Sequence, residues 1–283
     1  MIGATRSHNA LRSAVRNAWP EISARARTNR NAYVPESPKL LGSSHKVELG
    51  ARLGVRSAVL YLAPSVASGR DVCPNATTGC ATTCLGEHSG QLALPHAARS
   101  QLWKTTLFFG WRPMFLALLS REVATLAKRA GKEGTIPAVR CDGSSDTGIG
   151  SRIASEFPHV QCWDYTKNVA RALRHANGLY APNYHVTFSR SGENESDCLR
   201  VLRAGGSVAV VFDTPRGAPL PKTWRRWRVI DGDRSDARFL DRQTFGVPAG
   251  HVVGLRFKSE TFGNVDRDAS LRRSGSFVVR VAE

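Results

Sequence analysis

The chain of 283 residues has 40 lysines and arginines against 23 aspartates and glutamates, a formal net charge of +17. Its 41% hydrophobic and 22% charged residues are typical of a globular protein, which excludes wholesale disorder. No apolar run approaches the roughly 18 residues of a membrane span, so we expect no membrane partner. The positive charge attracts polyanions before specific contacts form, so nucleic acid is the expected partner.

Residues 1–45 are predicted to form a basic N-terminal arm and linker. This stretch lacks the apolar core of a secretory signal, and it ends in the turn-forming sequence VPESPKLLGSS. We expect part of the arm to form an amphipathic helix that contacts a phosphate backbone. Residues 46–283 are expected to form a single α/β barrel-like domain.

Short apolar runs alternate with helical stretches as far as residue 214, and the longest helical stretch covers residues 97–130. Alternation at this spacing predicts parallel strands joined by helices. Beyond Pro215 the helical pattern disappears. We therefore expect a parallel, TIM-barrel-like α/β fold with a helix-poor C-terminal half, as an irregular or incomplete barrel or as an open sheet. The predicted strands cover residues 57–64, 136–143, 160–167, 184–191, 207–214, 227–233, 250–257 and 277–282.

Cys73, Cys80 and Cys84 lie together in the loop after the first predicted strand, with the spacing C-x6-C-x3-C. Thiolates bind soft or borderline metals. One possible centre is a [4Fe–4S] cluster with one iron open to a small molecule. The other is a zinc ion completed by His88, which follows Cys84 by four residues, with His96 as a further candidate. Three unrelated buried thiols, or one disulfide and a spare thiol, are the structural alternative.

Polar residues follow most of the central predicted strands, and the carboxyl ends of parallel strands are where ligands bind. The same residue types are common as turn formers and helix caps, so a structural role is the alternative. In the segment DGDRSDARFLD (231–241) ion pairing with neighbouring arginines competes with cation binding. The expected catalytic residues are Asp142, Asp146, Asp164, Lys167 and Asp231.

The segment PKTWRRWRV (221–229) interleaves aromatic and basic residues. Aromatic faces stack on bases while guanidinium groups contact phosphates, which suits single-stranded or flipped-out nucleic acid. A basic edge strand with its tryptophans in the core is the alternative. The residues concerned are Trp224, Arg225, Arg226, Trp227 and Arg228.

Six segments follow one another in an order that resembles the "gene product 88" family of tailed-bacteriophage proteins. The resemblance runs from about Cys73 to the C-terminus and leaves residues 1–50 outside. It implies a phage origin and a location in the host cytoplasm, but no particular activity. The segments are CPNATTGCATTCL, VRCDGSSD, WDYTKN, NYHVTFSRS, VAVVFD and VIDGDRSDARFLD.

The layout of a strand, a three-cysteine loop and alternating strands and helices is also similar to the radical S-adenosylmethionine enzymes, whose motif is C-x3-C-x2-C. A looser likeness is to transglycosylases that exchange guanine for a deazaguanine, with zinc-binding cysteines and catalytic carboxylates. We therefore expect a phage enzyme that modifies a nucleic acid or nucleotide with an iron–sulfur cluster, with or without S-adenosylmethionine. A zinc-containing base-modifying enzyme and a non-catalytic nucleic-acid-binding regulator are the alternatives.

Overall fold

A nine-stranded, mostly parallel sheet forms the centre of the computed structural model, in the order β1-β2-β3-β4-β5-β6-β9-β8-β7. The structure describes residues 13–25 except 15 and 23, 38–84 except 44, 92, 94–258, 271 and 274–281. Strands β2 to β6, β9 and β8 pair in parallel, whereas β1 and β7 are antiparallel edge strands. The strands are β1 (Leu41–Gly42), β2 (Val55–Leu60), β3 (Ile136–Arg140), β4 (Gln161–Thr166), β5 (Tyr184–Ser189), β6 (Ser207–Phe212), β7 (Thr223–Trp224), β8 (Trp227–Asp231) and β9 (Val252–Arg256).

The predicted α/β class with a parallel sheet is confirmed, but closure into a TIM barrel is not established. The described sheet ends at β1 and β7, which do not pair with each other. The strand predicted at 277–282 is wrong for the described part of that range. There a 3-10 turn, η3 (Gly275–Phe277), is followed by a single parallel bridge from Val279 to Phe212.

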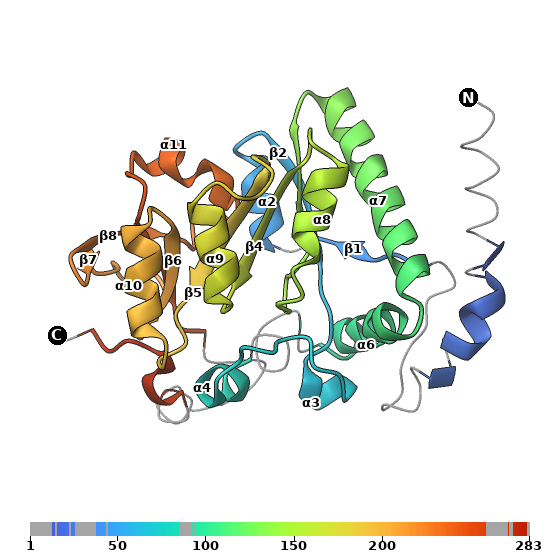
Figure 1. Ribbon diagram of the computed structural model, residues 1–283, viewed down its shortest axis with the longest axis horizontal. Coiled ribbons are helices and arrows are strands. Elements are labelled where there is room, and N and C mark those ends of the chain that lie inside the picture. Colours follow the sequence, from blue (N-terminus) through green and yellow to red (C-terminus); the bar gives the residue numbers. More distant parts are fainter. Residues whose placement is uncertain are drawn as a thin grey trace.

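Helices cover one face of the sheet, and the core between them is apolar (Figure 1). The helical stretch predicted at 97–130 is two helices, with the break at Trp111. Pro113 lies in the first turn of the second helix and has no N–H to continue the ladder of the first, so the chain must start a new helix there. The helices are α6 (Pro95–Gly110), α7 (Arg112–Glu133), α8 (Ile149–Glu156), α9 (Val169–Ala176) and α10 (Glu195–Arg203).

The opposite face has a thinner cover. Buried Trp163 projects from β4 into a cluster with Ala237, Phe239 and Leu240, which belong to the segment around the short helices η2 (Arg238–Leu240) and α11 (Asp241–Phe245). Helix α2 (His45–Ala51) lies against β2. Strand side chains alternate between the two covers because successive residues of a strand point to opposite faces.

Part of the basic N-terminal segment packs on the helical side of the sheet. Ile22 is fully buried in the same core as α6 and α7. Trp19 meets Trp103 edge to face, with 5.4 Å between the ring centroids. In the part of the chain that the structure describes, no helix has the length and apolarity needed to cross a membrane.

Candidate site at the carboxyl end of the sheet

The three-cysteine loop follows β2 and lies at the end of the sheet where α3 (Ser65–Ser68) and α4 (Thr78–Thr82) are found, along the lower edge of Figure 1. Two contacts attach it to neighbouring loops. The backbone N–H of Asp146, after β3, donates to the carbonyl of Val72 over 2.8 Å. The Thr77 hydroxyl donates to the carbonyl of Ser191, after β5, over 3.1 Å. The loop therefore spans the carboxyl ends of β2 to β5.

The C-terminal turn η3 holds the same loop in place. A Cβ on Gly79, in α4, would lie 2.9 Å from the Cβ of Phe277, so α4 and η3 approach closely because this position has no side chain. A Cβ on Gly192, at φ +94°, would lie 2.7 Å from the carbonyl carbon of Ser276. Arg190 donates from Nη1 to the carbonyls of Ser276 and Phe277 over 2.7 and 3.1 Å. Loop, strand end and C-terminal turn form one packed unit.

Cys73 is the thiol of the loop whose electrostatic surroundings are most clearly defined. Burial raises the pKa of Cys73 to about 12; Lys167 opposes the shift, whereas Cys84, Cys80 and Asp146 add to it. Cys73 therefore keeps its proton at neutral pH, and a metal ion would have to displace that proton on binding. Metal binding by these cysteines stays a prediction.

The geometry does not by itself form a metal cage. Within the described ranges, no three His, Cys, Asp or Glu side chains are close enough together to hold an ion. His88 lies outside the described residues, and His96 is exposed on α6. The donor set of three thiols still fits an iron–sulfur cluster or zinc. The other cysteines, Cys141, Cys162 and Cys198, are buried, and none of the six, all described, forms a disulfide.

Asp142 is buried in the loop between β3 and α8 and is saturated with hydrogen bonds. Its Oδ1 accepts from the Ser145 hydroxyl over 2.6 Å and from the hydroxyl and N–H of Thr147 over 2.8 and 2.9 Å. Its Oδ2 accepts from the N–H of Gly148 over 2.8 Å. The carboxyl group therefore fixes the chain that leads into α8.

Asp164, on β4, is completely buried beneath α8. Its Oδ1 accepts from the N–H of Asp142 over 2.7 Å, and its Oδ2 accepts from the Tyr184 hydroxyl over 3.0 Å. Burial, followed by the charge of Asp142, raises the pKa of Asp164 to about 8. A protonated or partly protonated carboxyl group in the interior is the result at neutral pH.

Asp146 is the predicted carboxylate closest to the cysteine loop. It accepts from the Thr166 hydroxyl over 2.7 Å and from the N–H of Lys167 over 2.9 Å, and it forms an ion pair with Arg171 of α9. Asp142, Asp146 and Asp164 are therefore brought together around Arg171, as a mainly internal network. Their catalytic role stays a prediction.

Gly150, in the first turn of α8, leaves the room that Asp164 occupies. A Cβ there would lie 2.0 Å from Asp164 Oδ2 and 2.9 Å from Tyr184 Cε2. Because both neighbours are held by hydrogen bonds, Gly150→Ala is expected to lower the free energy of unfolding by about 2–3 kcal/mol. Denaturant unfolding measures this. The control is Gly131→Ala on α7, where a Cβ meets nothing within 4 Å and stability should rise slightly; equal behaviour of the two variants would contradict the packing.

Asp231 does not join the other predicted catalytic residues. Its strand, β8, is separated from β4 by β5, β6 and β9. Both its carboxylate oxygens pair with Arg256 on β9, at 2.8 and 3.0 Å, and Asp233 shares the same arginine. The expected ion pairing of segment 231–241 is therefore present. Its arginine partners come mainly from other strands, and only Asp241 pairs within the segment, with Arg238.

The predicted nucleic-acid residues divide among three environments. Trp224 is buried in the core, which bears out the structural alternative for this residue. Arg228 donates to the carbonyls that end α11. Arg225, Arg226 and Trp227 line a cavity against α10.

Sequence reasoning missed Arg171, Tyr184 and Gly150 at the buried network, and Leu199 and Arg203 at the cavity. A signal existed for Arg171, because a basic helix after the strand that carries Asp164 offers an ion-pair partner. No local pattern distinguishes Arg203 from Arg200, the other exposed arginine of α10.

The fold and its loops define an α/β protein in which three thiols and an internal carboxylate network meet at the carboxyl end of a mostly parallel sheet. The model of the Gene product 88 family matches residues 25–270, and the chain therefore belongs to this phage family. The match begins well before Cys73, so placing residues 25–50 outside the family was wrong. No curated protein and no solved structure matches the chain, and the radical S-adenosylmethionine likeness gains no support.

Proposed function

We propose that the protein is a metal-dependent phage enzyme that modifies a nucleic acid or nucleotide, with an iron–sulfur centre held by Cys73, Cys80 and Cys84. The observation that supports this is the presence of three cysteines in one loop that spans the carboxyl ends of the strands. In parallel α/β sheets this end is where ligands bind.

Lys167 and Asp146 are the lysine and aspartate whose charges act on the Cys73 thiol, and both are half-buried. We assign to Lys167 the binding of a substrate phosphate, since a lysine ammonium is a point charge suited to that group. Asp146 holds the N–H of Lys167 and the guanidinium of Arg171, and so orients this side of the site. When bound, the cluster would supply an open iron position to a small molecule.

The zinc alternative with catalytic aspartates is less well supported. A carboxylate that acts as nucleophile or base must reach the substrate. Asp142 and Asp164 are 1% and 0% exposed and their oxygens are occupied by protein donors, so neither is available. We assign both a supporting role.

The same proposal covers the form of the sheet and the location of the protein. Strands β2 to β6 follow in sequential order with helices on one face, as in part of an irregular barrel. The family is a phage family, and the host cytoplasm, where thiols stay reduced and available for a metal, is the proposed location.

Purification without oxygen, followed by metal analysis and an absorption spectrum, tests the centre. We expect brown protein that contains iron and sulfide and absorbs broadly at roughly 400 nm. Cys73→Ser is expected to lose most of the iron, whereas Cys198→Ala, a buried thiol on α10, should keep it. Colourless protein with about one zinc would favour the alternative. Folded wild-type protein without metal, with all three thiols freely titratable, would overturn both.

A further inference from the structure

The hairpin between β7 and β8 turns through two residues in an unusual backbone conformation. Trp224 pairs with Trp227, so Arg225 and Arg226 form the whole turn. Their φ angles are +48° and +69°, and among the described non-glycine residues they alone have positive φ. Two-residue turns of this kind favour Asn-Gly, because both central residues need the left-handed region.

Arginine is disfavoured at such positions, since its Cβ crowds the backbone there. A hairpin with two arginines is therefore less stable than the same hairpin with asparagine and glycine. Local strain of this type is found where a side chain has a function that outweighs the lost stability. The strained turn thus suggests that Arg225 and Arg226 have a function.

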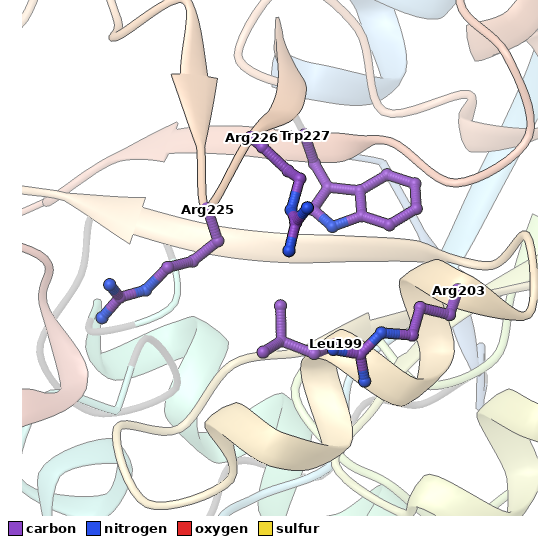
Figure 2. Close-up of a pocket in the computed structure, with 5 residues that line it drawn as sticks. All are labelled: Leu199, Arg203, Arg225, Arg226 and Trp227. Atoms are coloured by element: carbon purple, nitrogen blue, oxygen red, sulfur yellow. The ribbon is translucent and has the colours of Figure 1, made fainter.

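The hairpin and α10 border an open cavity of about 390 Å³ that is lined by both arginines. Figure 2 shows the Arg226 side chain extending from the hairpin toward α10, where Leu199 and Arg203 project from the helix. The indole of Trp227 lies beside Arg226. This volume is at the lower end of the range for small-ligand sites, roughly 300–1,000 Å³, and suits one nucleotide.

The charge of the cavity is positive. Arg225 pairs with Glu195 at 2.8 Å. Arg203 and Arg226 have no ion-pair partner within the described residues, so two guanidinium groups face the cavity without a counter-charge. Leu199 and the half-buried Trp227 supply the apolar part of the wall. Paired guanidinium groups next to an aromatic ring match a phosphate next to a base.

We propose that this cavity binds one nucleotide of a single-stranded nucleic acid, with a phosphate between Arg203 and Arg226 and its base against Trp227. The proposal rests on the proposed function for the class of ligand alone, and it does not require the cysteine centre. Trp224 and Arg228 take no part, since one is buried and the other faces α11.

Fluorescence anisotropy with a labelled single-stranded oligonucleotide at low salt provides the test. Arg226→Gly is expected to weaken binding about tenfold and to reduce the salt dependence of log K by about 0.7 per lost phosphate contact. The same change relieves the turn, so the Tm should rise by about 2–4 °C. Arg203→Ala should weaken binding without that rise. Arg129→Ala, an exposed arginine of α7, is the matched control for loss of charge alone.

Wild-type affinity in Arg226→Gly and Arg203→Ala, or a loss no larger than that of Arg129→Ala, would overturn the proposal. Competition by thymidine monophosphate as effective as that of the oligonucleotide would also overturn it, in favour of a free-nucleotide site. Iron content is measured on the same preparations. Intact oligonucleotide binding by protein without iron therefore overturns only the proposed metal centre. A normal iron content with unchanged binding in the variants overturns only the proposed nucleotide site.

Discussion

Asp142→Asn is expected to lower the free energy of unfolding by about 3 kcal/mol, with a clear fall in Tm. The Asp142 carboxyl group accepts four hydrogen bonds, from Ser145, Thr147 and Gly148. An asparagine in the same place has one acceptor oxygen, and its amide would face at least one of these donors with a donor of its own. A buried N–H left without an acceptor accounts for most of the loss.

Chemical denaturation followed by circular dichroism measures this effect. Asp197→Asn on α10 is the control, because its ion pair with Arg200 joins side chains that are 31% and 57% exposed and should change stability by less than about 1 kcal/mol. An Asp142→Asn protein as stable as the wild type would show that the network is not structural. If that protein also lost all activity, the catalytic prediction for Asp142 would be restored.

Asp164→Asn is expected to have the opposite sign, with an advantage over the wild type that grows with pH. In the folded protein Asp164 has a pKa of about 8, raised by burial and by Asp142. In the unfolded chain an aspartate has a pKa of about 3.9. Below that pH both states bind the proton and the group has no effect on stability. Between the two values only the folded state retains the proton, so the stability of the wild type falls as the pH rises and levels off above the folded pKa.

The full difference is on the order of 5 kcal/mol, which makes it the largest pH effect we expect from one side chain. Asparagine keeps an acceptor for the N–H of Asp142. The Tyr184 hydroxyl, which donates to Asp164 Oδ2, can rotate so that its oxygen accepts from the new amide, as it would from the protonated acid. Unfolding free energies of both proteins at pH 5, 6.5 and 8 provide the measurement. A constant difference between them would contradict a titrating Asp164. A wild type that gains stability relative to the variant with rising pH would show that the carboxylate is preferred in the fold.

The strands of the sheet were predictable because apolar, β-branched runs of strand length are an unusually clear signal. Seven predicted strands correspond to β2, β3, β4, β5, β6, β8 and β9. Two-residue β1 and β7 are too short to carry a pattern. The failure at residues 277–282 has a different cause. In this apolar run Val278 is buried and Val279 forms one bridge to Phe212, but no strand is formed.

The candidate site was predictable in composition and less so in geometry. The three cysteines are singled out by their spacing, and their role stays a prediction. The polar residues that follow β3 and β4 do lie together in the structure. Asp231 was grouped with them because strand order is a long-range property: β9 inserts between β6 and β8 and moves that residue away. The structural role of Asp142 has a local signal in the sequence. An aspartate followed by Ser145, Thr147 and Gly148 is typical of a side chain that closes its own turn.

The packing of α4 against η3 has a consequence for how the protein is made. Ribosomes release the chain from its N-terminus, and domains begin to fold as they emerge. The cysteine loop appears early, yet Gly79 and Arg190 find their partners at residues 274–281. During synthesis most of the sheet can therefore form before η3 is present to pack against the cysteine loop. The loop therefore reaches its final packing only after η3 has been made.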